Sequence, residues 1–190
     1  MSYILSYLGK IAPFAAIFSL IYLGVRGLTL KKNTTLTHEI GLFLYHLFLI
    51  AILSQTMTPT GSIYVWELSM PSFSAQTLNI IPFKIFSRLA ALEGERFTSY
   101  LIVNLLGNIL LFVPLGFFHR LSVRKKLWQS CVFGLCLTVG IEAFQLFLPR
   151  TTDIDDIILN FLGVAIGAAI ASWLLRYPKL RLDRFEKTQQ

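Results

Sequence analysis

The stretch Asn104–Gly116, NLLGNILLFVPLG, has the composition of a membrane-spanning helix except for two amide side chains. Asn104 and Asn108 are four residues apart, so they lie on the same face of a helix. An amide buried in hydrocarbon without a hydrogen-bond partner is strongly destabilising. The two asparagines therefore predict a helix bundle whose interior supplies polar partners.

The whole chain has the composition of a multi-pass membrane protein. It has 190 residues, of which 55% are hydrophobic and 14% charged, and its mean hydropathy is +0.65. A soluble domain carries about 25% charged residues. The long apolar runs predict one all-α transmembrane bundle over residues 1–190, with spans near the ~20 residues that cross a hydrocarbon core. The five expected spans are roughly Ile4–Val25, Ile40–Gln55, Tyr100–Phe118, Leu127–Leu148 and Ile154–Leu175.

The 17 Lys and Arg residues gather beside the ends of these apolar runs. Most lie in three segments: the connection after the first span, the connection after the third span, and the basic tail 176–190. The positive-inside rule places these three segments in the cytoplasm. The N-terminus and the segment 57–99 are then extracytoplasmic. The net charge of +7 is explained by this topology, and no nucleic-acid partner is expected because the chain has no separate soluble domain.

The extracytoplasmic segment contains one amphipathic pattern, IIPFKIFSRLAAL, at residues 80–92. On a helix, Ile81, Ile85, Leu89 and Leu92 form an apolar stripe, and the basic side chains lie opposite. This pattern is typical of a helix in the interface plane of the membrane. A loop helix packed against the bundle is the alternative.

Polar residues recur at similar depth in the last three spans. They are Asn104 and Asn108, then Glu142 and Gln145, then Asp153, Asp156 and Asn160, with Arg150 in the turn between the last two spans. At about 1.5 Å per residue, Asn108, Glu142 and Asn160 each lie on the order of 10 Å below the outer boundary. Ionisable side chains inside a span usually face the bundle interior or a wet cavity. We therefore predict a polar ligand pocket, open to the exterior, formed by these eight residues.

Small residues continue the Asn160 face of the fifth span as Gly163, Gly167 and Ala171. Such residues let helices approach closely, so Gly163 and Gly167 are expected at a helix contact. In the third span, Pro114 and Gly116 are expected to bend the helix below the pocket.

The acidic residues at the start of the fifth span also have a plainer structural interpretation. Asp153, Asp155 and Asp156 can cap that helix, because negative charge is favourable at a helix N-terminus. For Asp155 capping is the favoured interpretation. Asp153 and Asp156 are the weak candidates for oxygen ligands of a cation, and no metal site is predicted.

Two structural alternatives concern the other polar residues. Glu142 can form an ion pair with Arg150 or Lys10, and the two asparagines can simply join helices by hydrogen bonds. Cys131 and Cys136 lie on different faces of one apolar run, so they are expected to be buried free thiols.

The residues of these spans resemble a known family. The segments NLLGNILLFVPLGFF (104–118) and GIEAFQLFLPRTTDIDDIILNFLGVAIGA (140–168) are similar to the VanZ-like family of bacterial membrane proteins, and NIIPF (79–83) is similar to the element that precedes them in relatives. The resemblance covers residues 79–168. Its motif residues here are Asn104, Asn108, Phe112, Pro114, Gly116, Glu142, Gln145, Arg150, Asp153, Asp156, Asn160 and Gly163.

The resemblance implies a multi-pass protein of the bacterial cytoplasmic membrane. The family's namesake is associated with resistance to the glycopeptide teicoplanin, and no agreed biochemical activity comes with the resemblance. The favoured function is binding of an envelope ligand: a membrane lipid, a lipid-linked cell-wall precursor or the lipoglycopeptide. An intramembrane enzyme that uses Glu142 and Asp156 is one alternative, although the sequence suggests no Ser/His pair. A small transporter or an assembly partner is the other, and no cofactor is expected.

Overall fold

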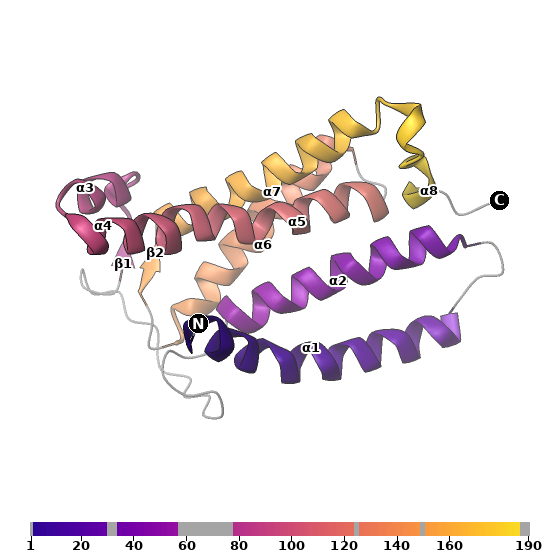
Figure 1. The fold of residues 1–190 in the computed structure, drawn as a ribbon, viewed down its shortest axis with the longest axis horizontal. Coiled ribbons are helices and arrows are strands. Elements are labelled where there is room, and N and C mark those ends of the chain that lie inside the picture. Colours follow the sequence, from indigo (N-terminus) through magenta and orange to yellow (C-terminus); the bar gives the residue numbers. More distant parts are fainter. Residues whose placement is uncertain (1, 30–33, 57–77, 124–125, 149–150, 187–190) are drawn as a thin grey trace.

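The chain folds into a bundle of long helices. The computed structural model describes residues 2–29, 34–56, 78–123, 126–148 and 151–186, and within these ranges the side chains of residues 2–11, 14, 29 and 186 are not described. In chain order the elements are α1 (Ser2–Thr29), α2 (Leu36–Thr56), β1 (Leu78–Asn79), α3 (Lys84–Ala90), α4 (Gly94–Tyr100), the π-helical turn η1 (Leu101–Leu106), α5 (Gly107–Ser122), α6 (Leu127–Gln145), β2 (Thr152–Asp153), α7 (Ile154–Leu174), the 3-10 turn η2 (Pro178–Leu180) and α8 (Asp183–Glu186) (Figure 1). The predicted all-α class is confirmed.

Four helical segments of the described ranges are long and apolar enough to cross a membrane. They are Leu36–Thr56, Gly94–Ser122, Leu127–Gln145 and Ile154–Leu174. The second of these joins α4, η1 and α5 into 29 residues, about 43 Å of helix, so it begins earlier than the expected span from Tyr100. α1 lies over the first expected span, and its apolar part is Ala15–Leu28. The first expected span, Ile4–Val25, and the orientation of the bundle stay predictions.

The closest helix contact is between α5 and α7, which run in the same direction (Figure 1). A Cβ atom on Gly163 would lie 2.3 Å from the carbonyl oxygen of Ile109, and one on Gly167 would lie 2.0 Å from that of Val113. These distances are far below van der Waals contact, so only glycine allows the two backbones to approach this closely.

The bend expected at Pro114 and Gly116 stays a prediction. α5 continues through both residues as α-helix, and a Cβ on Gly116 would lie 2.1 Å from the carbonyl oxygen of Val164 on α7. The irregular turn is the π-helical stretch Leu101–Leu106, which contains Asn104. Gly116 thus serves close packing, because its missing side chain admits the backbone of α7.

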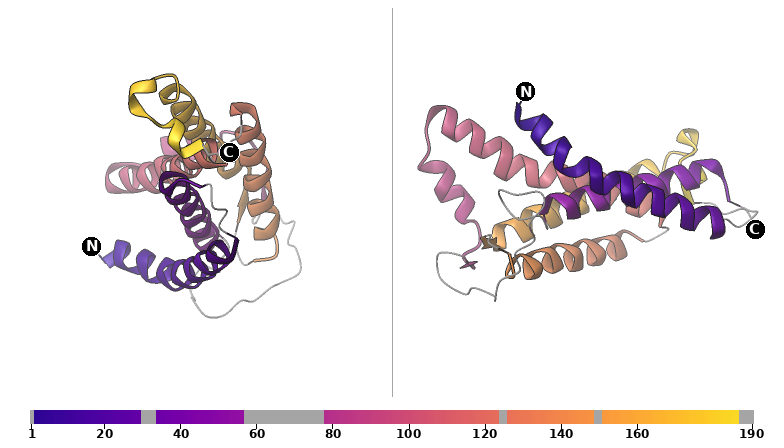
Figure 2. Two further views of the ribbon diagram at one scale, coloured as in Figure 1. Left: turned by 90° about the vertical axis from the view of Figure 1, so that its right-hand side faces the viewer. Right: turned by 90° about the horizontal axis from the view of Figure 1, so that it is seen from below.

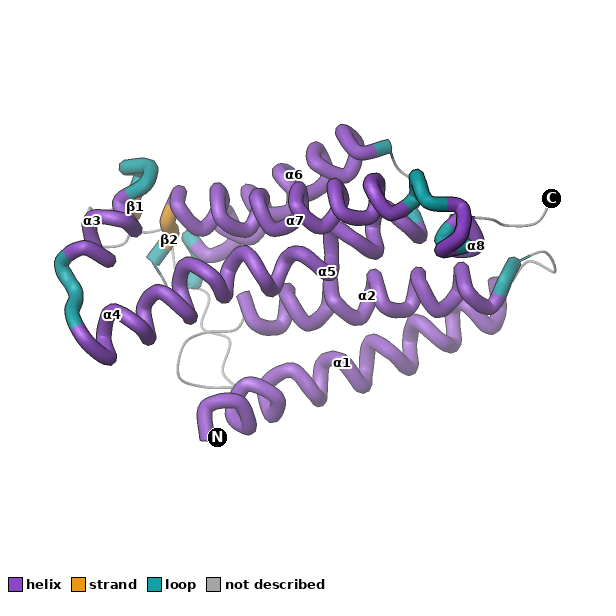
Figure 3. The backbone as a smooth tube through the Cα atoms, turned by 45° about the horizontal axis from the view of Figure 1, so that its top comes forward, coloured by secondary structure: helices purple, strands orange, loops and turns teal. Residues whose placement is uncertain are grey.

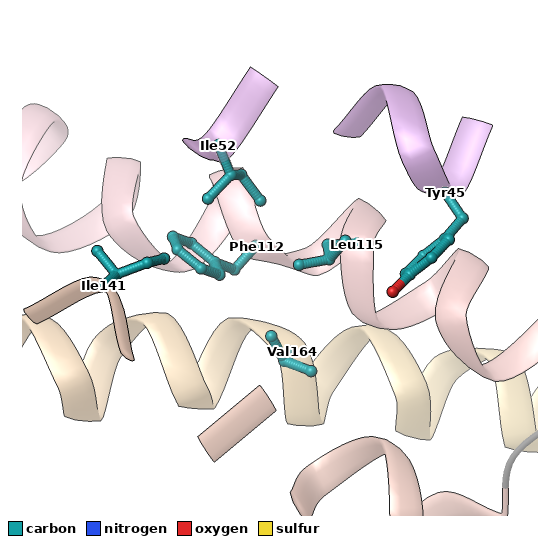
Figure 4. Close-up of a cluster of buried hydrophobic side chains, with 6 residues drawn as sticks. All are labelled: Tyr45, Ile52, Phe112, Leu115, Ile141 and Val164. Atoms are coloured by element: carbon teal, nitrogen blue, oxygen red, sulfur yellow. The ribbon is translucent and has the colours of Figure 1, made fainter. Parts of the chain in front are cut away.

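The hydrophobic core lies midway along the bundle. Four fully buried side chains form its centre: Phe112 and Leu115 of α5, Ile52 of α2 and Val164 of α7 (Figure 4). Ile141 of α6 completes the contact between the helices. Because these side chains exclude water, the polar residues at either end of the bundle are separated by an apolar layer.

Short elements close the end of the bundle that is predicted to lie outside. β1 and β2 form a parallel pair in which Leu78 lies opposite Thr152 and Asn79 opposite Asp153. Figure 3 shows both strands beside α3, and Figure 2 shows α3 running across the direction of the long helices. Residues far apart in sequence are thereby brought to the start of α7.

The amphipathic segment forms a shorter helix than its pattern suggests. α3 comprises Lys84–Ala90 only, so Ile81 and Leu92 of the expected stripe lie outside it. Ile85 is 4% exposed and packs against the bundle, whereas Ile81 is 60% exposed. The helix thus contacts the bundle through one buried side chain, and whether it also lies in the interface plane of the membrane stays a prediction.

Candidate functional site

Asp153 is the centre of a hydrogen-bonded group at the start of α7. Its Oδ1 accepts hydrogen bonds from the Asn79 side chain (2.7 Å) and from the backbone N–H of Asp155 (3.0 Å). Arg88 of α3 donates to its Oδ2 at 2.9 Å. Asp153 is thus the N-cap of α7, and it also joins β1 and α3 to that helix.

The carboxylate of Glu142 brings α6 to the same place. Its Oε2 accepts a hydrogen bond from the backbone N–H of Asp153 at 3.1 Å, and the residue is 3% exposed. Arg150, which was expected at the rim of the pocket or as a partner of Glu142, lies outside the described residues. The same is true of the side chain of Lys10.

The two asparagines of the opening stretch have different partners. Asn108 donates to Oδ1 of Asp156 on α7 at 2.7 Å, which answers where its amide is directed. Asn104 donates to the carbonyl oxygen of Tyr100 on its own helix at 3.4 Å. Asn108 therefore joins two spans, whereas Asn104 satisfies its N–H locally.

Gln145 and Asn160 are buried but make no hydrogen bond to the carboxylates. Gln145 donates to the carbonyl oxygen of Thr56 at 2.9 Å, which ties α6 to the end of α2. Asn160 is 4% exposed, and its Oδ1 has no hydrogen-bond partner among the described residues. It lies one turn beyond Asp156 on the face of α7 whose next small residue, Gly163, meets the backbone of α5.

The sequence of the chain matches a known family model. The model described as VanZ/LLP1 matches residues 43–176, which is well over half of the chain. The chain belongs to the VanZ-like family. The match covers most of α2 as well as the spans that carry the polar residues, so it extends beyond the resemblance at residues 79–168. Curated proteins and solved structures give no significant match.

Three residues of this VanZ-like site were missed as site residues by sequence reasoning. Asn79 and Arg88 both donate hydrogen bonds to Asp153. Asn79 could have been found from the NIIPF element, and Arg88 from the basic face of the amphipathic segment. The hydrogen bond of Arg88 with Tyr100, and then its ion pair with Asp153, raise the pKa of the guanidinium above its usual value.

The third missed residue is Asp155, for which capping of α7 was the favoured interpretation. Instead, its carboxylate accepts hydrogen bonds from the backbone N–H groups of Phe83 (2.5 Å) and Ile85 (2.7 Å) at the start of α3. Phe83 adopts the left-handed conformation there, with φ 63°. Asp155 thus caps a helix about 70 residues away in sequence, because a carboxylate stabilises the positive end of any helix that it reaches.

We call these residues the outer polar network: Asn79, Arg88, Asn108, Glu142, Asp153, Asp155 and Asp156. Among its described members, carboxylates outnumber guanidinium groups, so the VanZ-like site offers mainly hydrogen-bond acceptors. In the described ranges, no three His, Cys, Asp or Glu side chains are arranged to hold a metal ion. The weak cation candidates Asp153 and Asp156 already accept hydrogen bonds from Asn79, Arg88 and Asn108.

Two expectations about reactive side chains were wrong. Cys131 is only partly buried and Cys136 is exposed on the outside of the bundle, although both thiols are free as expected. A Ser/His pair does exist: Nδ1 of His119 lies 3.0 Å from Oγ of Ser130, with both residues buried. His119 lies near the end of α5, and Ser130 lies near the start of α6. The apolar core therefore separates this pair from the polar residues around Asp153.

Proposed function

We propose that this VanZ-like protein binds the polar head group of a cell-envelope molecule at the outer polar network. The observation that supports this most is the joining of polar side chains from α5, α6 and α7 at one end of an apolar bundle. Ionisable side chains inside a membrane bundle are costly, and they commonly mark a substrate or ion site. Buried polar groups at such a position are therefore expected to serve a ligand.

Asn160 indicates what the ligand must supply. A buried acceptor without a donor costs about 1–3 kcal/mol, and the Oδ1 of Asn160 has no donor among the described residues. A ligand that donates a hydrogen bond there would recover this free energy. The acceptor-rich network beside it favours the same chemistry, namely the hydroxyl and amide N–H groups of a sugar or peptide head group.

A lipid-linked cell-wall precursor combines such a head group with a lipid tail. Its tail would lie in the membrane beside the apolar helices while its head group reached the network from the predicted outer side. A lipoglycopeptide such as teicoplanin has the same two parts. Binding of either would connect the protein with glycopeptide resistance, as the family resemblance implies.

The test is a titration of the purified protein in nanodiscs with a fluorescent lipid-linked wall precursor. We expect Asn160→Leu to weaken binding about tenfold, since a hydrogen bond worth about 1.4 kcal/mol is lost. The same variant should unfold no more easily than wild type, because the buried acceptor without a partner is removed. Asn104→Leu is the matched control: among the described residues its amide bonds its own helix, so the affinity of this variant should equal that of wild type.

Two results would contradict the proposal. Equal affinity for wild type and Asn160→Leu would show that the Asn160 amide does not contact the ligand. Chemical conversion of the precursor that is lost in Asp156→Asn would favour the intramembrane enzyme instead.

A further inference from the structure

A cleft between α1 and α2 lies at the end of the bundle opposite the outer polar network. The two helices run side by side (Figure 1), and the cleft has a volume of about 470 Å³, within the range of small-molecule sites. Its walls are mainly apolar and include Leu23, Ile40 and Phe43. Leu23 is 57% and Ile40 46% exposed, so the cleft opens on the outside of the bundle, where the hydrocarbon lies.

Gly27 makes room in this cleft. It lines the cavity, and a Cβ atom there would meet nothing within 4 Å. The ring of Tyr22 lies behind it, 5.8 Å from that of Phe43, and closes the cleft on the protein side. The apolar part of this cleft offers water no hydrogen-bond partners. In a membrane, the molecules available to fill it are lipids.

An ion pair lines the same cleft. Nε of Arg26 donates to Oε2 of Glu39 at 2.9 Å, and its Nη2 donates to Oε1 at 2.5 Å. Both side chains are partly exposed, at 27% and 19%. A guanidinium has five N–H donors, so this pairing uses two and leaves three for another acceptor. Because Glu39 holds the group in one orientation, Arg26 presents these donors in the fork geometry that suits phosphate.

We propose that this cleft binds one membrane phospholipid from the leaflet on the basic, predicted cytoplasmic side. An acyl chain lies along Leu23, Gly27 and Phe43, and the lipid phosphate accepts hydrogen bonds from Arg26. The phosphate oxygens accept the guanidinium N–H groups that Glu39 does not use, and the apolar walls complement the chain. The site is separate from the outer polar network and does not depend on the function proposed there.

The acyl part is tested with a pair of glycines on α1. Gly27 lines the cleft, whereas Gly24 does not, and neither would bring a Cβ within 4 Å of another group. Gly27→Leu and Gly24→Leu are titrated in detergent with dioleoyl phosphatidylglycerol, and native mass spectrometry gives the Kd of the first bound lipid. We expect Gly27→Leu to bind about tenfold more weakly, as when roughly two acyl methylenes leave the cleft, and Gly24→Leu to match wild type.

The phosphate part is tested with the double variant Arg26→Gln/Glu39→Gln. Removing both charges avoids leaving either one unpaired, so the variant remains suitable if Arg26→Gln alone fails to fold. We expect about tenfold weaker lipid binding, and no competition from an excess of inorganic phosphate, which lacks the acyl chain.

Four outcomes would overturn the proposal, three of which concern the acyl chain. Those three are equal lipid affinity in wild type and Gly27→Leu, equal weakening by Gly24→Leu, and displacement of the lipid by inorganic phosphate. Unchanged affinity in the double variant would remove Arg26 as the phosphate ligand and overturn it as well.

Discussion

Replacing Asp155 by alanine should release α3 from the bundle without unfolding the long helices. In the wild type, its carboxylate accepts the backbone N–H groups of Phe83 and Ile85 at 2.5 and 2.7 Å. Asp155 is 3% exposed, so water does not replace these bonds readily. A hydrogen bond to a charged group contributes about 1.5–3 kcal/mol, which sets a loss of roughly 3–6 kcal/mol before relaxation.

Burial of Ile85 opposes this release. Its side chain is 4% exposed, and full burial of such a side chain contributes about 1.5–3 kcal/mol. This contribution holds the segment near the bundle in the variant, although its backbone can open. The lower end of that loss, about 3 kcal/mol, corresponds to roughly a hundredfold increase in the open population.

Hydrogen–deuterium exchange of the protein in nanodiscs measures this opening. The peptide that covers residues 80–90 should exchange about a hundredfold faster in Asp155→Ala, while peptides from α6 and α7 beyond the first turn keep their protection. Glu93→Ala is the matched control, since the Glu93 side chain makes no capping hydrogen bond at α4. Unchanged exchange over residues 80–90 in Asp155→Ala would refute the role assigned to the carboxylate.

Three further predictions concern packing and polar pairs. Gly167→Ala should lower the free energy of unfolding by about 3 kcal/mol, because its Cβ would lie 2.0 Å from a backbone oxygen of α5. Gly140→Ala is the control and should leave the free energy of unfolding unchanged, because a Cβ there would meet nothing within 4 Å. Equal thermal stability of the two variants would contradict the packing argument. Arg88→Gln should cost at most about 1 kcal/mol, and the difference from wild type should shrink in high salt, because the ion pair is partly exposed; a loss independent of salt would speak against an electrostatic origin. His119→Phe should lower the free energy of unfolding by about 1–3 kcal/mol, because it removes the hydrogen-bond partner of the Ser130 hydroxyl. The double variant with Ser130→Ala should regain most of this free energy in chemical denaturation. No regain would exclude the His119–Ser130 pair as the cause.

The helices were predictable because crossing hydrocarbon requires long apolar runs, and these are visible in the sequence. The start of the third span was less predictable. Its helix continues outward to Gly94 through residues that are not apolar, so hydropathy alone placed the boundary near Tyr100.

For the glycines of α7 and for Asn108, the sequence predicted the kind of contact but not the partner. Their spacing predicted a close helix contact and a polar partner, respectively. Which carbonyl faces Gly167, and that Asp156 faces Asn108, depend on the relative rotation and shift of α5 and α7. A shift of one turn would exchange every such pair, and the apolar pattern tolerates it.

By itself, the sequence determined that this chain is a membrane bundle and that its polar residues must find partners inside it, because hydrocarbon supplies no hydrogen bonds. Only the tertiary structure decided the pairs. Asp155 looks like a local cap of α7, yet it caps α3, since folding brings the start of α3 within hydrogen-bond distance of the start of α7. Such long-range pairing depends on how the segments between meet in space, which local spacing does not encode.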